Sequence, residues 1–378
     1  MNISWPQGID TEVFLQQYWQ QKPLLIKNAF PDFDNPLDEN ELAGLALDDD
    51  ANARFIECVD GHEWRLSHGP FDCDFFDGIS GHQWSLLISD VEKLLPDFRH
   101  YLQPFRFIPD WRIDDLMISY APVGGSVGAH IDQYDVFLLQ ASGEREWQIE
   151  TSPRQPTTHN LNSSIALLGD FNADETYTLG AGDMLYLPPK YAHHGIAVTD
   201  PCMTWSVGFR APSTDEMLPS LVTYLLEELK QPQRFEDAGR AVTQQPGLIS
   251  DSDFSEIRRL VRNALQTTDT ALDKCIGRYL SEPPAHELPD PLEVTVDALF
   301  NHRNQSLQLH CNSAHTLAYK LDADNALLFA NGECFAVSQT LAETLSSQRA
   351  INLADVLPQD QQAITALVNQ HTLLDDET

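Results

Sequence analysis

The chain has 378 residues, a length that predicts two or three domains. Its formal net charge is -34, with 57 acidic against 23 basic side chains, which argues against nucleic acid as a partner because phosphate binding needs a basic face. The acidity suits a positively charged partner, or it serves solubility alone.

Cysteine usage and the N-terminus predict a cytoplasmic protein. The six cysteines are scattered without C-x-x-C spacing, so we expect neither a zinc site nor a disulfide framework. The first residues, Met1–Pro6, lack the basic and apolar regions of a leader, and no apolar run is long enough to span a bilayer. No membrane association is therefore expected.

The N-terminal part of the chain predicts short helices and strands. Asp60-Gly61 between two alternating segments is a strong hairpin signal. The expected helices cover Asp10–Gln21, Pro36–Leu47 and Asp90–Leu102, and the expected strands cover Pro23–Lys27, Arg54–Cys58, Glu63–Leu66 and Trp84–Ile88.

Short strands with glycine and proline turns dominate the next part. Strands are expected within Trp111–Tyr120, at Val136–Gln140, at Arg145–Ile149 and just before Pro188. With few helices between them, these strands predict a double-sheet jelly roll or cupin-like barrel over residues of about 50–210.

After Arg210 the pattern becomes helical. Ser213 and Glu216 have the spacing of a capping box, and apolar residues then recur at helical spacing, with a second helix at Asp253–Leu265. Residues 213–275 are therefore expected to form a helical segment without strands. Its apolar stripe is typical of a core, with a dimer interface as the alternative.

The last ninety or so residues predict a small mixed domain after a proline linker, Pro283-Pro284 and Pro289–Pro291. The order helix, ribbon, helix is compatible with a winged-helix shape. The expected helices are Val294–Phe300, Gln339–Ser346 and Asp360–Gln370, and the expected strands are Ala318–Leu321, Ala326–Phe329 and Cys334–Val337.

The stretch Gly124–Asp135 carries the strongest chemical signal. His130 and Asp132 lie two residues apart after a glycine-rich turn, and residues i and i+2 of a strand point to the same face. An imidazole and a carboxylate directed at one point are two thirds of the facial triad that holds non-haem Fe(II). An isolated H-x-D also occurs by chance as a surface turn.

A third ligand is available after the apolar strand that ends at Pro188. His193 and His194 both follow it, and because neighbours on a strand face opposite ways, only one of them can be the ligand. Two imidazoles and one carboxylate leave three iron positions open, for a bidentate co-substrate and O₂.

Arg145 is the candidate for the far carboxylate of that co-substrate. A 2-oxoglutarate molecule that chelates iron needs a cation for its other end, and the planar guanidinium fork suits a carboxylate. Because Glu144 and Glu146 flank Arg145, a surface ion pair is the alternative.

Three stretches, Trp111–Ser119, His130–Phe137 and Ser206–Pro212, strongly resemble the bacterial ribosomal oxygenases, which are JmjC-type, Fe(II)- and 2-oxoglutarate-dependent arginine hydroxylases of a large-subunit ribosomal protein. The resemblance is dense over residues 60–212. It implies an α+β protein with a JmjC, cupin-like double-stranded β-helix in residues 1–212, a helical dimerisation segment in 213–280 and a winged-helix-like domain in 281–378.

The resemblance also implies roles for individual residues, with no catalytic side chain beyond the iron centre. This chain departs from the family pattern at Ala192 and His194, where proline and an acidic residue are usual. The implied iron ligands are His130, Asp132 and His193; the implied 2-oxoglutarate site contains Arg145, Ser119 and Thr204; and Asp115, Tyr134 and Ser206 are implied to hold the substrate guanidinium, with Met117 against its stem.

The expected function is hydroxylation at Cβ of an arginine in a basic large-subunit ribosomal protein, by a homodimer using Fe(II), 2-oxoglutarate and O₂. The alternatives are a ribosomal-protein histidyl hydroxylase and a cupin-type metal dioxygenase or isomerase acting on a small molecule. A DNA-binding regulator is disfavoured, because Arg303, Lys320 and Arg349 are the only arginine or lysine residues in 290–378.

Overall fold

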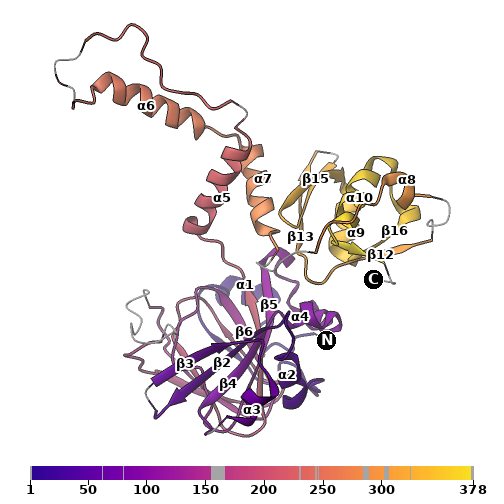
Figure 1. Cartoon of the computed structure of the whole chain (residues 1–378). Coiled ribbons are helices and arrows are strands. Elements are labelled where there is room, and N and C mark those ends of the chain that lie inside the picture. The colour runs from indigo at the N-terminus through magenta and orange to yellow at the C-terminus, as the bar shows by residue number, and fades with distance from the viewer. Residues whose placement is uncertain are drawn as a thin grey trace. The chain divides into compact units, whose positions relative to one another are not determined.

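The computed structural model describes residues 2–61, 63–79, 81–154, 167–229, 231–242, 245, 247–283, 289–301, 306–323 and 325–375. It consists of two compact units, Met1–Ala211 and Pro212–Thr378 (Figure 1). The first is built mainly of strands, and the second combines helices with small sheets, so the expected α+β fold class is confirmed.

Two sheets form the first unit. The large sheet has eight strands in the described residues, in the order β1-β9-β6-β11-β5-β4-β2-β3, and the small one has the order β10-β7-β8. The strands of the large sheet are β1 (Leu24–Ile26), β9 (Met184–Leu187), β6 (Asp135–Ser142), β11 (Cys202–Phe209), β5 (Ile113–Ala121), β4 (Trp84–Ser89), β2 (Asn52–Val59) and β3 (Glu63–His68), and those of the small sheet are β10 (His193–Ala197), β7 (Arg145–Ile149) and β8 (Glu175–Leu179).

The large sheet is buried on both faces. On its outer face, Phe14 of α1 (Thr11–Gln17) and Leu42 of α2 (Glu39–Leu45) join one core with Ile118 and Trp205. Its inner face meets the small sheet in a second core. The residues of this second core are Val136, Leu138, Leu185 and Leu187 from the large sheet and Trp147, Ile149 and Leu179 from the small one.

The helix expected at Asp90–Leu102 is divided. Only α4 (Val91–Leu94) is α-helical, and a 3-10 segment η1 (Pro96–Phe105) follows. Pro96 explains the break, because proline lacks the backbone N–H that would continue the α-helix. Two further short elements, α3 (Cys73–Asp77) and η2 (Asp110–Arg112), were not predicted.

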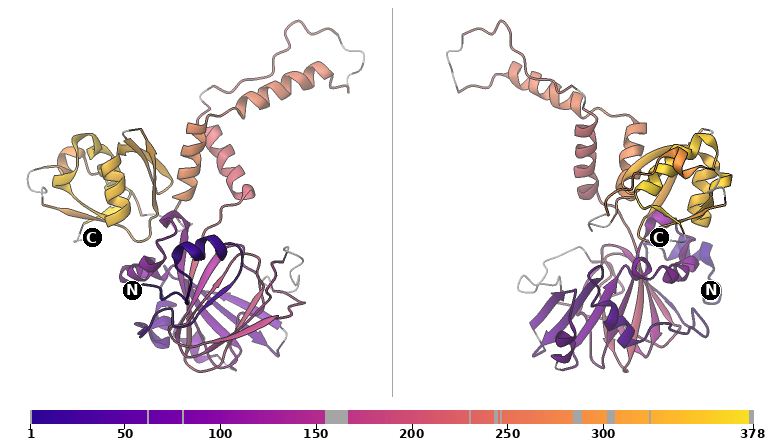
Figure 2. Two further views of the ribbon diagram at one scale, coloured as in Figure 1. Left: turned by 180° about the vertical axis from the view of Figure 1, so that it is seen from behind. Right: turned by 45° about the vertical axis from the view of Figure 1, so that its right-hand side comes forward.

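The second unit begins with three helices, α5 (Thr214–Glu227), α6 (Asp251–Ala264) and α7 (Asp269–Leu280). The capping box at Ser213 is present. Helices α5 and α7 pack side by side (Figure 2), whereas α6 buries none of its residues. In the described part of the chain, no helix is both long and apolar enough to cross a membrane.

The rest of the second unit is a mixed body with its own core, centred on Leu328, Leu345, Ile364 and Leu367. Of the predicted proline linker, residues 284–288 lie outside the described residues. The elements are α8 (Val296–Leu299), α9 (Gln339–Gln348), α10 (Gln361–Asn369), two 3-10 turns, η3 (Leu353–Asp355) and η4 (Pro358–Asp360), and two sheets: β16 (Ala350–Asn352), β12 (Gln308–Cys311) and β17 (Leu373–Leu374), and β13 (Leu317–Asp322), β14 (Asn325–Ala330) and β15 (Glu333–Ser338).

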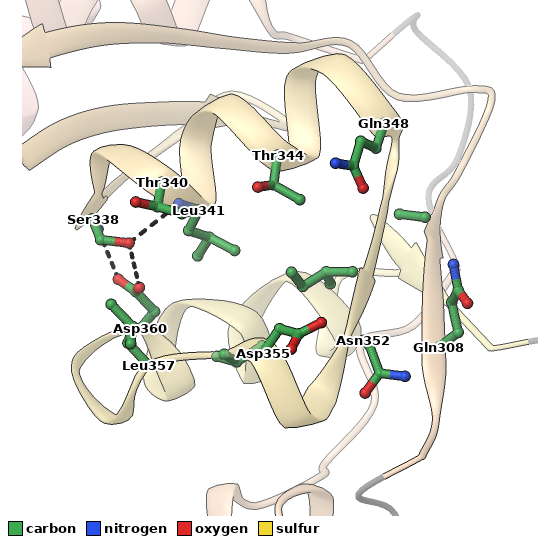
Figure 3. A pocket seen from close by; sticks show the side chains of 13 residues that line it. Gln308, Ser338, Thr340, Leu341, Thr344, Gln348, Asn352, Asp355, Leu357 and Asp360 are labelled. Carbon is green, nitrogen blue, oxygen red and sulfur yellow. Dashed lines mark hydrogen bonds between the residues drawn. The ribbon is translucent and has the colours of Figure 1, made fainter.

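A pocket of about 440 Å³ lies beside α9 in this body (Figure 3). Polar side chains and apolar ones such as Leu341 and Val356 line it together. Asp360 at one end accepts hydrogen bonds from the Ser338 N–H and hydroxyl at 2.8 and 2.6 Å. Its lining contains no histidine or cysteine. The pocket therefore lacks the imidazoles that the expected iron centre requires.

Candidate metal centre

His130, Asp132 and His193 come together in the first unit. Each offers a ligand atom, and these atoms all lie within 4.8 Å of one another. The Asp132 carboxylate is 3.9 Å from Nε2 of His130 and 3.5 Å from Nε2 of His193. His193 therefore belongs to this cluster, whereas the ring of His194 packs near Phe171.

A single β-bridge holds the cluster. The N–H of His130 donates to the carbonyl of His193 and the reverse bond is also present, both at 3.0 Å, while the Lys190 N–H donates to the Asp132 carbonyl. The expectation of a strand through His130 and Asp132 is wrong, since β6 begins only at Asp135. The pairing of His130 with His193, rather than the alternation of a strand, brings the two imidazoles together beside Asp132.

Hydrogen bonds orient the two imidazoles. Nδ1 of His130 lies 2.9 Å from the Gly128 carbonyl, and Nδ1 of His193 lies 3.0 Å from the Tyr191 carbonyl. These contacts place the proton on Nδ1 and leave the Nε2 lone pairs facing Asp132. Burial lowers the pKa of His193 to about 4, so this imidazole is neutral near pH 7. Two imidazoles and a carboxylate fit the ligand preference of Fe(II).

Arg145 lies on the same inner wall and is 3% exposed. Its Nε and Nη2 are buried without a hydrogen-bond partner, and no carboxylate forms an ion pair with it in the described residues. Burial rules out the alternative of a surface ion pair. A buried guanidinium with free donors is costly unless an anion joins it, and a carboxylate matches its geometry.

The wall between Arg145 and His193 is formed by Trp147. Arg145, Trp147 and His193 face inward from paired strands, since Arg145 lies opposite Ala197 and Trp147 opposite Gly195. The indole lies 5.8 Å from the His193 ring, between centroids. A Cβ at Gly195 would approach the indole to 2.7 Å, so only glycine leaves room for it.

Ser119 and Thr204 are paired across β5 and β11, and both are buried. The Ser119 hydroxyl donates to the Thr204 carbonyl at 3.3 Å, and the Thr204 hydroxyl donates to the Gln140 side-chain oxygen at 3.0 Å. Both hydroxyls keep acceptor capacity. None of these hydrogen bonds reaches Arg145.

Asp115 and Tyr134 face each other across Gly208 and define what we call the acidic slot. A Cβ at Gly208 would lie 3.1 Å from the Asp115 carboxylate and 3.9 Å from the Tyr134 ring. Burial, together with Asp90 and Asp114, raises the pKa of Asp115 to about 7. Burial and the nearby Asp132 carboxylate raise the pKa of Tyr134. The slot therefore adjoins the metal cluster.

Met117 lies two residues from Asp115 on β5, and Ser206 lies two residues from Gly208 on β11. The two residues are directly opposite each other. Arg54 of β2 reaches this pair, because its Nη2 lies 3.3 Å from the Met117 sulfur. Sequence reasoning missed Arg54 and Gly208. The available signal for Arg54 was a charged residue at an inward position of an alternating strand.

Two family descriptions match the chain: the JmjC domain over residues 100–217 and the ROXA-like winged helix over residues 264–373. The ribosomal protein uL16 3-hydroxylase of Escherichia coli is 33% identical over 295 residues, covering 77% of this chain and 76% of that protein. A probable ribosomal oxygenase of Haemophilus influenzae is 31% identical over 308 residues, covering 76% and 74%.

Solved structures agree with these relatives. The X-ray structure of Escherichia coli YcfD matches over the full length of both chains, with a TM-score of 0.81 and 30% identity. The structure of YcfD, a ribosomal oxygenase, in complex with cobalt and 2-oxoglutarate has a TM-score of 0.78 and 29% identity over 99% of both chains.

Proposed function

The chain belongs to the ribosomal oxygenases that combine a JmjC domain with a ROXA-like winged helix, and on that premise we propose that it hydroxylates Cβ of an arginine in the ribosomal protein uL16. It is a 2-oxoglutarate-dependent oxygenase with Fe(II) as its metal. The observation that carries the proposal is the pairing of the His130, Asp132 and His193 cluster with the unpartnered guanidinium of Arg145 on one inner wall.

The three cluster residues would hold Fe(II) through two Nε2 atoms and the carboxylate. When bound, Fe(II) would activate O₂, which is the oxidant, and 2-oxoglutarate would supply two electrons as it is oxidised to succinate and CO₂, so that one oxygen atom of O₂ could enter a C–H bond. Arg145 would bind the distal carboxylate of 2-oxoglutarate, with Ser119 and Thr204 beside the co-substrate. The indole of Trp147 and the apolar inner core exclude water from this end of the barrel.

The acidic slot would bind the side chain of the substrate arginine. Asp115 would accept the guanidinium with help from Tyr134 and Ser206, while Met117 would pack on the aliphatic stem. Binding a guanidinium favours the ionised form of Asp115, which burial otherwise disfavours. The net charge of -34 would steer a basic ribosomal protein toward the enzyme.

Mass spectrometry of uL16 tests the proposal. Recombinant uL16 is incubated with the protein, Fe(II), 2-oxoglutarate and air, in parallel with the Asp132→Ala variant. We expect a gain of one oxygen atom on an arginine with the wild type and none with the variant. Oxygen on a histidine, or no oxygen on uL16, would contradict the proposal.

A second copy of the chain is the proposed partner of the helical segment 213–280. Apolar side chains on one face of α6 are exposed, and α5 adds Leu218, Val222 and Leu226. An apolar stripe of this length is normally covered by protein in solution. The exposed apolar side chains at helical spacing on and just after α6 are Phe254, Ile257, Val261 and Leu265. Modification of a ribosomal protein would place the dimer in the cytoplasm.

A further inference from the structure

Arg54 is a half-buried cation on the wall of the substrate region that the proposed function leaves unused. Its Nη2 donates to the Ser89 hydroxyl at 3.2 Å and lies 3.3 Å from the Met117 sulfur. Its Nε is buried and has no hydrogen-bond partner. The hydroxyl of Ser89 and the sulfur of Met117 are weak, neutral acceptors, and the Nε–H has none. A guanidinium has five N–H donors, so Arg54 can accept further partners.

No carboxylate forms an ion pair with Arg54 among the described residues, although the chain has 57 acidic side chains. Arg65, on the neighbouring strand, shows the usual arrangement, with Glu63 at 2.9 Å. A partly desolvated cation without an acceptor is unfavourable, and an incoming oxygen atom would relieve that cost. Arg54 is therefore prepared to receive an acceptor that the chain itself does not provide.

The position of Arg54 limits what that acceptor can be. Arg54 lies opposite Leu87, which in turn lies opposite Ser119, and its Nη2 contacts Met117, which lies two residues from Asp115 on β5. It is thus a neighbour of the acidic slot. A substrate guanidinium would be repelled by Arg54, so the group that meets it must be an oxygen of the substrate outside that guanidinium.

We propose that Arg54 binds the main-chain carbonyl oxygen of the substrate residue that is hydroxylated. This inference rests on the proposed function. The carbonyl is joined to Cβ through Cα alone, whereas the guanidinium is separated from Cβ by several rotatable bonds. Holding the carbonyl therefore fixes Cβ more directly than the acidic slot does.

The test compares Arg54→Met, Arg54→Lys and the matched control Arg65→Met on a uL16 peptide that the wild type hydroxylates. Arg54→Met should raise the KM for the peptide roughly 10- to 100-fold, the loss expected for a hydrogen bond to a charged group. It should also lower the yield of hydroxylated peptide per succinate formed. The KM for 2-oxoglutarate should stay unchanged, Arg54→Lys should recover part of the loss, and Arg65→Met should match the wild type.

Two further arms distinguish a contact with the main-chain carbonyl from a structural role of Arg54 and from binding of a substrate carboxylate. If Arg54 acted only by holding Met117, its effect would vanish in a Met117→Leu background, and this would overturn the proposal. If it bound a substrate carboxylate, a peptide with its acidic residues changed to alanine would no longer respond to Arg54→Met, which would also overturn it. An unchanged peptide KM and an unchanged yield in Arg54→Met would also overturn the proposal about Arg54. A wild-type protein that does not hydroxylate the peptide would contradict the proposed function itself.

Discussion

The two units treat buried charge in opposite ways. Asp360 in the second unit is 1% exposed, and both its oxygens accept hydrogen bonds from Ser338. Arg145 in the first unit is 3% exposed, yet two of its nitrogens have no partner. A satisfied buried charge stabilises local structure, and an unsatisfied one costs stability. The contrast indicates that Arg145 is held for a ligand and Asp360 for the fold.

Arg145→Met should give the largest effect. Losing a charge-assisted, bidentate contact should raise the KM for 2-oxoglutarate roughly 100-fold, as measured from succinate formation. Without 2-oxoglutarate, thermal denaturation should show a Tm equal to or above that of the wild type, because a buried unpaired cation is gone. An unchanged KM for 2-oxoglutarate would contradict the claim that Arg145 is unpaired because it binds a ligand. Arg65→Met serves as the control.

Asp360→Ala should have the opposite effect: it should lower stability and leave the KM for 2-oxoglutarate unchanged. Removing the carboxylate leaves the buried Ser338 N–H and hydroxyl without their acceptor, which should lower the unfolding free energy of the second unit by about 2–3 kcal/mol. Urea denaturation measures this loss, with exposed Asp355→Ala as the control from the same pocket. The KM for 2-oxoglutarate should not change; a rise comparable to that of Arg145→Met would refute the comparison.

Asp115 should give a smaller, pH-dependent effect. Since its pKa is about 7 and only the ionised form attracts a guanidinium, the KM for uL16 should fall roughly tenfold between about pH 6 and pH 8. The folded state holds this proton more tightly than the unfolded chain does, so its stability decreases as pH rises from the ordinary pKa of 3.8 toward 7. Asp115→Asn should flatten the KM profile and raise the Tm near pH 8. A profile identical to that of the wild type would contradict this role.

The smallest effect on catalysis is expected from α6. Ile257→Glu with Val261→Glu should convert a dimer to a monomer in sedimentation velocity, because each charge would be buried in an apolar interface. Exposed Asn263→Asp is the control on the same helix. We expect kcat on a short peptide to stay within about twofold, since the metal cluster lies wholly in the first unit. A wild type that sediments as a monomer would contradict the proposed interface.

Local patterns in the sequence predicted much of this organisation. The need for a cation at the far carboxylate of the co-substrate selected Arg145 on its expected strand, and the H-x-D spacing with a later histidine pointed to the residues that meet in the cluster. The capping box at Ser213 marked the first residue of the helical part. In each case the signal lies within a few neighbouring residues.

Features that depend on distant strands were not predictable. The slot requires β11 to lie beside β5, which brings Gly208 against Asp115 from far along the chain. The bridge between His130 and His193 replaced an expected strand for the same reason. Arg54 on β2 reaches Met117 on β5 because only one strand, β4, lies between these two strands in the sheet. Register between strands sets these contacts, and no single segment encodes it.

Isotopically labelled dioxygen offers the most direct test of the central claim. With Fe(II), 2-oxoglutarate and uL16, the account predicts one labelled oxygen atom on Cβ of an arginine and one in succinate, in equal amounts, and neither with Asp132→Ala. Label in succinate without label in uL16 would contradict the assigned substrate. Label in neither product would contradict the oxygenase itself.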